Sequence, residues 1–453
     1  MMSSDMDEGT FHDVHMHAFN LSHPYLYAFI RRFKSKLGAL LCFGPAIPFF
    51  RRFPDLFPTT ASLLETKIDG AKNLLSVMEN DLGSLFLVIE NCLREGEKPL
   101  LKTEGLRIGE RTYKRIVLTP LMMDFGYKGK TPPGNKRPER TFHYDIPASK
   151  PIKEQVTDVF NGIKDYVGTR SSEDLARKFP ALYSGEEGKP DRALEIYPFL
   201  GLNTQNYTCD GIDELFRKYF GTRAPSKHEL LVNLGRFDGD IEHLTTGSFA
   251  GVKVYPPLGF DPWPEGRYGN PEELRKVKLL YSRCCEKNLP ITAHGGMGGF
   301  VTIDKKRLRA YASVEKWEKV LTAFPDLKLN LAHFPMDERM LWFVPNPLHP
   351  LRNAYVKLVL NHANVYIDFS CQVDGDAYFV ALAKTLRGLP NPERKRLTER
   401  ILFGSDFAVN LLGVDSYNRC LTFFSGTEAL TADEKHAFCS LNPQRFLFAL
   451  PEP

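Results

Sequence analysis

A chain of 453 residues of which 43% are hydrophobic can bury a large core, so its composition excludes a disordered or fibrous protein. Its 59 basic and 55 acidic residues leave a formal net charge of +4, which gives no reason to expect a nucleic-acid partner. The eight cysteines form no Cys-x-x-Cys pair, which favours reduced residues over a disulfide framework. Without a secretory signal or an apolar run of about 20 residues, we expect a cytoplasmic protein and no membrane contact.

The first predicted strand, residues 11–19, carries polar side chains at alternating positions. A strand places every second side chain on one face, so Asp13, His15 and His17 are expected to project together. Two imidazoles at this spacing can bind one metal ion, and Asp13 can orient these ligands without binding the ion itself. His12 should face the opposite side and have a structural role.

The segment that follows, residues 21–58, is strongly basic. It carries six basic residues before its first acid, Asp55: Arg31, Arg32, Lys34, Lys36, Arg51 and Arg52. Two interpretations are open: a helical insertion with its arginines in solvent, or a lid that attracts an anionic substrate or a membrane surface. We favour the lid.

Residues 60–94 show helical spacing of apolar residues, and residues 115–121 look like a buried second strand. The next segment, 125–151, is rich in Gly, Pro and basic residues and is predicted to be a long loop. Its charges suggest an acidic substrate: Lys128, Lys130, Lys136, Arg137 and Arg140.

From about residue 249 onward, strands and helices are predicted to alternate with a period near 40 residues. Eight strands can be counted, near residues 14, 118, 198, 253, 292, 331, 367 and 403. This pattern is typical of α/β proteins with a parallel sheet, and eight strands favour a closed (β/α)8 TIM barrel. We therefore predict one domain, 1–453, with a helical insertion or lid after strand 1 (20–100) and a long, loop-rich insertion after strand 2 (125–190).

Several of these strands end in a residue that can bind metal or move a proton. Lys253 lies in GVKVY, His294 ends ITAH, His333 ends LNLAH and Asp406 ends ILFGSD. Catalytic groups of such barrels sit at the carboxyl ends of the strands. These residues are therefore expected to form one site with the histidines of the first strand.

The ordered set resembles the amidohydrolase superfamily, and within it the amidohydrolase-related family of metal-dependent TIM-barrel hydrolases and decarboxylases. The resemblance rests on seven segments: DVHMH (13–17), GVKVYP (251–256), AHGG (293–296), LAHF (331–334), VYID (365–368), GSD (404–406) and LNPQRFL (441–447). It covers residues 10–19 and about 190–450, whereas 20–110 and 125–190 have no identifiable counterpart.

The resemblance implies a site for a divalent metal, zinc in the first place, with one or two ions. The implied ligands are His15, His17, His294 and Asp406, and the implied catalytic residues are Asp406, as proton shuttle, and His333. His333 would bind a second ion or hydrogen-bond the nucleophile or the substrate. Lys253 would either be carboxylated and bridge two ions, or form an ion pair or orient the substrate. We favour a single ion, and no other cofactor is expected.

The expected function is that of a metal-dependent hydrolase, in which metal-activated water attacks an amide, ester or lactone of a small, acidic substrate. One alternative is a lyase that removes CO₂ from an aromatic or unsaturated acid without oxidation, using the same ligands. Another is a non-catalytic barrel that binds a membrane surface or a partner through residues 21–58. Association into a homo-oligomer stays open.

Overall fold

The structure is a computed structural model that describes residues 9–23, 70, 72–95, 99–125, 152–168, 192–244, 246–336, 348–371 and 375–448. The basic segment 21–58 is described only as far as residue 23, and residues 126–150 and 169–191 lie outside the described part. The predictions of a lid and of a long basic loop, with all their lysines and arginines, therefore stay predictions.

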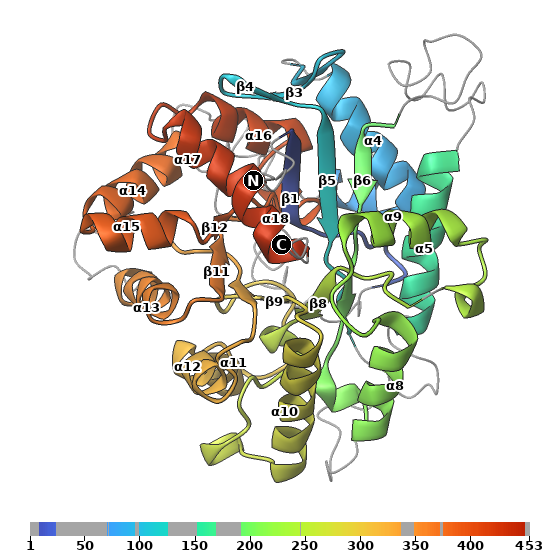
Figure 1. The fold of residues 1–453 in the computed structure, drawn as a ribbon, viewed down its shortest axis with the longest axis vertical. Coiled ribbons are helices and arrows are strands. Elements are labelled where there is room, and N and C mark those ends of the chain that lie inside the picture. The colour runs from blue at the N-terminus through green and yellow to red at the C-terminus, as the bar shows by residue number, and fades with distance from the viewer. Residues whose placement is uncertain are drawn as a thin grey trace, which may run out of the picture.

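Nine short parallel strands lie in the middle of the molecule, and helices surround them (Figure 1). The strands are β1 (Thr10–Met16), β5 (Arg115–Pro120), β6 (Leu194–Ile196), β7 (Phe199–Gly201), β8 (Gly251–Val254), β9 (Ile291–Ala293), β10 (Leu329–Leu331), β11 (Val365–Asp368) and β12 (Ile401–Leu402). They form two sheets, with the orders β1-β5-β6 and β12-β11-β10-β9-β8-β7. The predicted α/β architecture with parallel strands is confirmed.

Backbone hydrogen bonds connect the two sheets at both of their ends. The amide of Val14 donates to the carbonyl of Phe403 over 3.1 Å, and that of Asp406 donates to His15 over 2.7 Å, so β1 is bonded to the segment that contains and follows the end of β12. At the other end, β6 runs into β7. The predicted third strand, 194–202, is divided there because Pro198 has no N–H to continue the ladder.

A third sheet, which is antiparallel, was not predicted from the sequence. It consists of β2 (Leu101–Lys102), β3 (Gly105–Ile108) and β4 (Arg111–Tyr113), in that order. These strands are two to four residues long, too short for an alternating pattern to be recognised.

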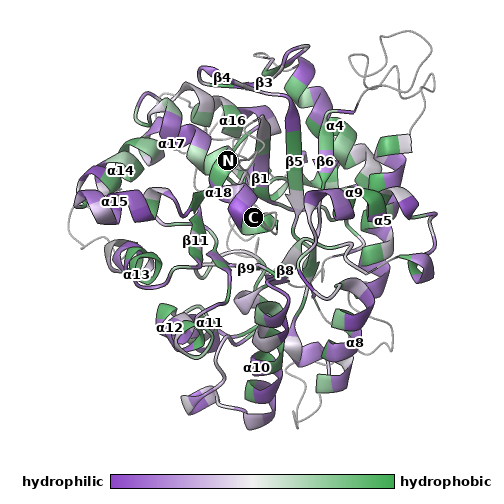
Figure 2. Cartoon of the chain, in the orientation of Figure 1, coloured by the Kyte–Doolittle hydropathy of each residue, from purple (hydrophilic) through white to green (hydrophobic). Residues whose placement is uncertain are grey.

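The helices connect the parallel strands and cover them from outside. They are α4 (Leu82–Glu95), α5 (Ile152–Gly168), α8 (Cys209–Tyr219), α9 (Lys227–Arg236), α10 (Pro271–Glu286), α11 (Lys305–Tyr311), α12 (Val314–Ala323), α13 (Leu348–Asn361), α14 (Asp376–Arg387), α15 (Asn391–Thr398), α16 (Tyr417–Gly426), α17 (Ala432–His436) and α18 (Asn442–Leu447). Figure 2 shows strands that are mostly hydrophobic and helices that carry both kinds of residue. Within the described part of the chain, no helix is long and apolar enough to span a membrane.

The helix starts follow the capping rules. Asn270 caps α10 by accepting from the amides of Glu272 and Glu273, and Thr431 with Glu434 forms a capping box at the start of α17. The cap of α8 is Thr208 and not Asp210, because the Thr208 hydroxyl accepts from the amide of Gly211. Asp210 lies in the first turn, where a carboxylate interacts favourably with the helix dipole.

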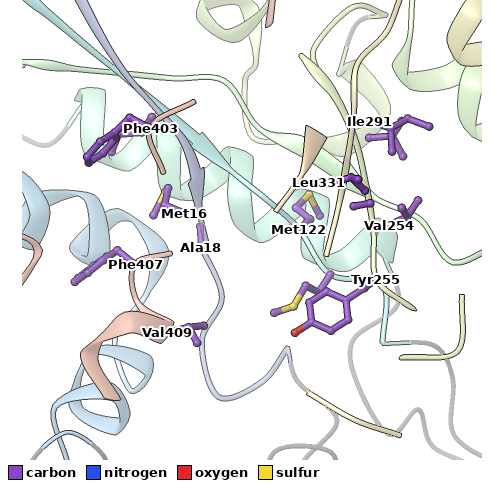
Figure 3. Packing of buried hydrophobic residues seen from close by; sticks show 14 of the residues in the cluster. Met16, Ala18, Met122, Val254, Tyr255, Ile291, Leu331, Phe403, Phe407 and Val409 are labelled. Atoms are coloured by element: carbon purple, nitrogen blue, oxygen red, sulfur yellow. The ribbon is translucent and has the colours of Figure 1, made fainter. Parts of the chain in front are cut away.

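The apolar core extends up to the carboxyl ends of the strands. Figure 3 shows Val254, Ile291 and Leu331, from the neighbouring strands β8, β9 and β10, packed near Met122. All four side chains are at most 2% exposed. The polar residues that follow these strands therefore lie next to a closely packed apolar layer, where electrostatic interactions are stronger than in water.

Candidate metal centre

The structure brings the predicted site residues together at the carboxyl ends of the parallel strands. His15 lies in β1 and Lys253 in β8, while His17, His294, His333 and Asp406 follow the ends of β1, β9, β10 and β12. His15 is fully buried, and Lys253, Asp406, His17 and His294 are between 1% and 6% exposed. Buried groups of this kind require partners, and they find most of them in one another.

The carboxylate of Asp406 lies between the two histidines of the first strand. Its Oδ1 is 3.2 Å from Nε2 of His17 and 3.5 Å from Nε2 of His15. The ammonium nitrogen of Lys253 lies 3.5 Å from the same Nε2 of His15. One imidazole nitrogen thus faces both a carboxylate and a lysine.

His294 and His333 form the other half of the centre. Nδ1 of His294 and Nε2 of His333 are 3.0 Å apart, and the ring of His333 lies 4.9 Å from that of His15. Among the described residues, His15, His333 and Asp406 are the group whose ligand atoms all lie within 4.8 Å of one another. The predicted ligands His17 and His294 border this group, through Asp406 and His333 respectively.

Each histidine has its second ring nitrogen bonded away from the centre. Nδ1 of His15 donates to Asp368 over 2.9 Å, Nδ1 of His17 to the carbonyl of Leu121 over 2.9 Å, and Nδ1 of His333 to the carbonyl of Ser370 over 3.0 Å. Nε2 of His294 donates to the carbonyl of Gly298 over 3.2 Å. Histidines that bind metals characteristically donate their other N–H to a carboxylate or a carbonyl in this way.

This arrangement leaves hydrogen-bond acceptors facing one another. Burial lowers the pKa values of His294 and His333, and their mutual proximity lowers that of His294 further, so both rings are neutral. A neutral imidazole that donates through one nitrogen presents a lone pair on the other. The two lone pairs 3.0 Å apart repel unless a cation or a proton lies with them, so the residues fit a metal ion.

The charges of the centre have clear physical causes. Burial alone would raise the pKa of Asp406, but the hydrogen bond from His17 and the neighbouring imidazoles hold it well below its usual range. Burial lowers the pKa of Lys253 from 10.5 to about 8, although Asp368 and Asp406 oppose this shift. Burial, together with the charge of Lys253, lowers the pKa of His15 to about 3. At pH 7 the centre thus holds a charged Asp406 carboxylate and neutral rings of His15, His294 and His333.

Two of these residues occupy a backbone conformation that is unusual for residues with a side chain. His333 has a φ of 64° and Asp406 has a φ of 60°, both in the left-handed region. Such conformations cost free energy and are typically found at functional sites, where surrounding contacts maintain them. The amide of Asp406 is held by His15, and that of His333 by Asp368 over 3.1 Å.

The first strand departs from the predicted alternation. Its pairing with β5 shifts register between Asp13 and Met16. This shift interrupts the regular alternation that would place Asp13 on the same face as His15 and His17. The Asp13 carboxylate accepts from the amides of His15 and Ser405 and from the hydroxyl of Tyr417. It holds β1 against the segment that carries Asp406, in line with the suggested orienting role.

Sequence reasoning missed three residues that support the centre. Ser370 and Asn330 hydrogen-bond Asp368, and the ring of Tyr255 stacks on His294 with centroids 4.2 Å apart. Asp368 and Ser370 alternate at the end of β11, which is the only sequence signal that could have pointed to Ser370. The contacts themselves are between residues far apart in the chain.

Comparison with known proteins identifies the family. Residues 237–449 match the family described as Amidohydrolase. The matched region contains Lys253, His294, His333 and Asp406, and it confirms the resemblance and the prediction of an enzyme of this metal-dependent kind. No curated relative of the chain is found.

Three of the solved structures that match the chain share little of its sequence. A 5-carboxyvanillate decarboxylase from Novosphingobium aromaticivorans, complexed with manganese, is 10% identical over 99% of both chains, with a TM-score of 0.42. A 4-oxalomesaconate hydratase from Rhodopseudomonas palustris is 13% identical, covering 96% of this chain and 95% of its own, with a TM-score of 0.40. The phosphotriesterase homology protein from Escherichia coli is 13% identical over 98% and 99%, with a TM-score of 0.41.

Proposed function

We propose that the protein is a metal-dependent hydrolase that uses water to cleave an amide, ester or lactone of a small molecule. The observation that carries the proposal is the pair of facing lone pairs on His294 and His333, 3.0 Å apart and next to the group of His15, His333 and Asp406. Acidic compounds are the first substrates to test, because residues 21–58 are strongly basic.

We also propose that the parallel strands form one closed (β/α)8 barrel. The proposal is supported by the bonds from Val14 to Phe403 and from Asp406 to His15, which connect β1 with the end of the other sheet. A closed barrel would collect the carboxyl ends of all its strands around one mouth, which explains why these residues meet. No disulfide is formed among the described cysteines, which supports a reducing, cytoplasmic location.

The proposed ligands of the ion are His15, His17, His294 and Asp406. Their mixture of imidazole and carboxylate donors suits zinc, which is our first choice, in a site with a single ion. When bound, such an ion polarises a carbonyl group and lowers the pKa of water to about 7. His333, whose Nε2 faces Nδ1 of His294 and which forms a group with His15 and Asp406, would be a further ligand of this ion or of a second one, or would hydrogen-bond the substrate.

The remaining steps fall to side chains of the chain itself. Asp406 is unprotonated at neutral pH, so it can accept a proton from the attacking water and pass it to the leaving group. Lys253, 3.5 Å from Nε2 of His15, is placed to orient an oxygen of the substrate as a cation. Carboxylation of Lys253 is the alternative if two ions are bound.

Metal content is the first test. Protein purified without chelator is analysed for metals, as wild type and as His15→Ala with His17→Ala. We expect about one equivalent in the wild type and loss of metal in the variant. Two equivalents would assign Lys253 a bridging role, and no metal even after addition of Zn²⁺ would refute the proposed function.

The reaction class requires a second assay. Amides, esters, lactones and unsaturated or aromatic acids are incubated with the loaded protein in water enriched in ¹⁸O, and the products and CO₂ are measured. Incorporation of ¹⁸O without CO₂ is the expected result. Release of CO₂ without incorporation would establish the decarboxylase alternative.

A further inference from the structure

Ser370 makes side-chain contacts with two histidines of the centre at once. It follows β11 and is fully buried. Its Oγ lies 3.0 Å from Nδ1 of His15 and 3.0 Å from Nδ1 of His333, and it also hydrogen-bonds Oδ1 of Asp368. One hydroxyl therefore connects a residue of the first strand with a residue more than 300 positions later.

The hydrogen positions follow from the partners of Asp368. Its carboxylate can only accept, and it takes hydrogen bonds from Asn330 over 2.7 Å and from Nδ1 of His15 over 2.9 Å. The hydroxyl of Ser370 therefore donates to Asp368, which leaves the lone pairs of its Oγ to accept from both rings. Each Nδ1–H is shared: that of His15 between Ser370 Oγ and Asp368, and that of His333 between Oγ and the backbone carbonyl of Ser370. Both imidazoles are then protonated on Nδ1, and their Nε2 lone pairs point toward the centre.

We propose that Ser370 is a positioning residue whose hydroxyl holds the rings of His15 and His333 in their orientation together. Asp368 alone cannot do this, because its side chain reaches the ring of His15 but only the backbone amide of His333. Among the described residues, Ser370 is the one whose side chain hydrogen-bonds both rings. The inference rests on the proposed metal site and adds a residue that the ligand set does not contain.

The test is metal affinity, measured on protein freed of metal. Zn²⁺ is titrated in competition with a chromogenic chelator into wild type, Ser370→Ala and the control Ser440→Ala. Ser440 is also fully buried, but its Oγ has no hydrogen-bond partner in the described part of the chain. We expect the Zn²⁺ dissociation constant of Ser370→Ala to rise about 10- to 100-fold, as for other residues that orient metal ligands. Ser440→Ala should leave it unchanged.

Two further variants distinguish a positioning role of the hydroxyl from a general disturbance of the fold. Ser370→Thr keeps the hydroxyl and should bind Zn²⁺ more tightly than Ser370→Ala, and it also serves if Ser370→Ala does not fold. In a His333→Ala background, Ser370→Ala should still weaken binding through His15, but by a smaller factor than in the wild type. An equal factor, or none, would mean that the serine acts through one ring only and would refute the shared role.

The outcome is distinguishable from failure of the proposed function. If the wild type binds no Zn²⁺, the metal site itself is wrong. If the wild type binds Zn²⁺ and Ser370→Ala binds it equally well, the site stands and the inference about Ser370 is overturned. Imidazole ¹⁵N shifts of the metal-free protein provide an independent measurement, since loss of the hydroxyl removes a hydrogen bond at Nδ1 of both rings and should shift both Nδ1 resonances.

Discussion

The tight packing next to His15 predicts that a single methyl group added at position 404 will weaken metal binding. A Cβ added to Gly404 would lie 2.6 Å from the Cβ of His15 and 3.1 Å from the Cβ of Ser370. Ordinary contact begins at 3.4 Å, so the first distance is short by 0.8 Å (3.4 − 2.6 Å). Gly404→Ala must therefore displace β1 relative to the segment that carries Asp406, by a substantial part of that distance.

The size of the effect follows from this displacement. Overpacking a core typically costs about 1–3 kcal/mol of stability, and misplacing catalytic groups by about 1 Å costs on the order of 100-fold in rate. We expect Gly404→Ala to weaken Zn²⁺ binding about 10- to 100-fold, the range seen when ligand support is lost. Its thermal unfolding temperature should fall by a few degrees.

The assay compares Zn²⁺ affinity and thermal unfolding of the metal-free proteins. Gly426→Ala is the matched control, because a Cβ there has no heavy atom within 4 Å. It should behave like the wild type in both measurements. Wild-type Zn²⁺ affinity in Gly404→Ala would contradict the packing of β1 against this segment, and with it the geometry of the centre.

Three further predictions concern charge and metal. Because the folded state releases the proton of Lys253 at about pH 8 and the unfolded chain only at 10.5, the unfolding free energy of the metal-free protein should rise with pH in this window. The rise, about 3 kcal/mol at most by the size of the shift, should be absent in urea titrations of Lys253→Met. The unfolding free energy should fall as pH drops from 6.5 toward 3, because His15 takes up its proton at a higher pH in the unfolded chain than in the folded protein. Burial raises the pKa of Asp13 to about 7, so protonation of Asp13 opposes this fall above pH 4. Asp13→Asn should therefore make the loss of stability in acid steeper. Chelation should lower the unfolding temperature, and Zn²⁺ at 100 times its dissociation constant should restore about 2.7 kcal/mol, but not in His15→Ala with His17→Ala.

The parts of the fold that could be predicted are those with a local signal. The apolar runs that end at Lys253, His294 and His333 have a regular spacing of about 40 residues, and each is a strand in the structure. Helix starts such as Asn270 and Thr431 depend on residues within one turn of the chain. The order of polar residues at the strand ends was enough to identify the residues of the candidate site.

The parts that could not be predicted depend on pairing between distant segments. The register shift in β1 arises from its neighbour β5, and no pattern within residues 10–16 signals it. Ser370 looks like any small polar residue after a strand until His15 and His333 are placed beside it. Two residues that can cap a helix, Thr208 and Asp210, lie at the start of α8, and only the backbone conformation selects Thr208.

The two halves of the centre differ in how far apart their residues lie in the chain. His294 and His333 follow β9 and β10, which are paired neighbours, so folding of adjacent strands brings them together. His15 and Asp406 meet only when β1 bonds the segment after β12, through backbone bonds and through Asp13, which accepts from Ser405 over 3.0 Å. An ion bound by both His15 and Asp406 would add its binding free energy to this long-range contact. Metal binding should therefore stabilise the junction of β1 with this segment more than it stabilises β9 and β10, and hydrogen exchange at the amides of Val14 and Asp406 should slow most when Zn²⁺ is added.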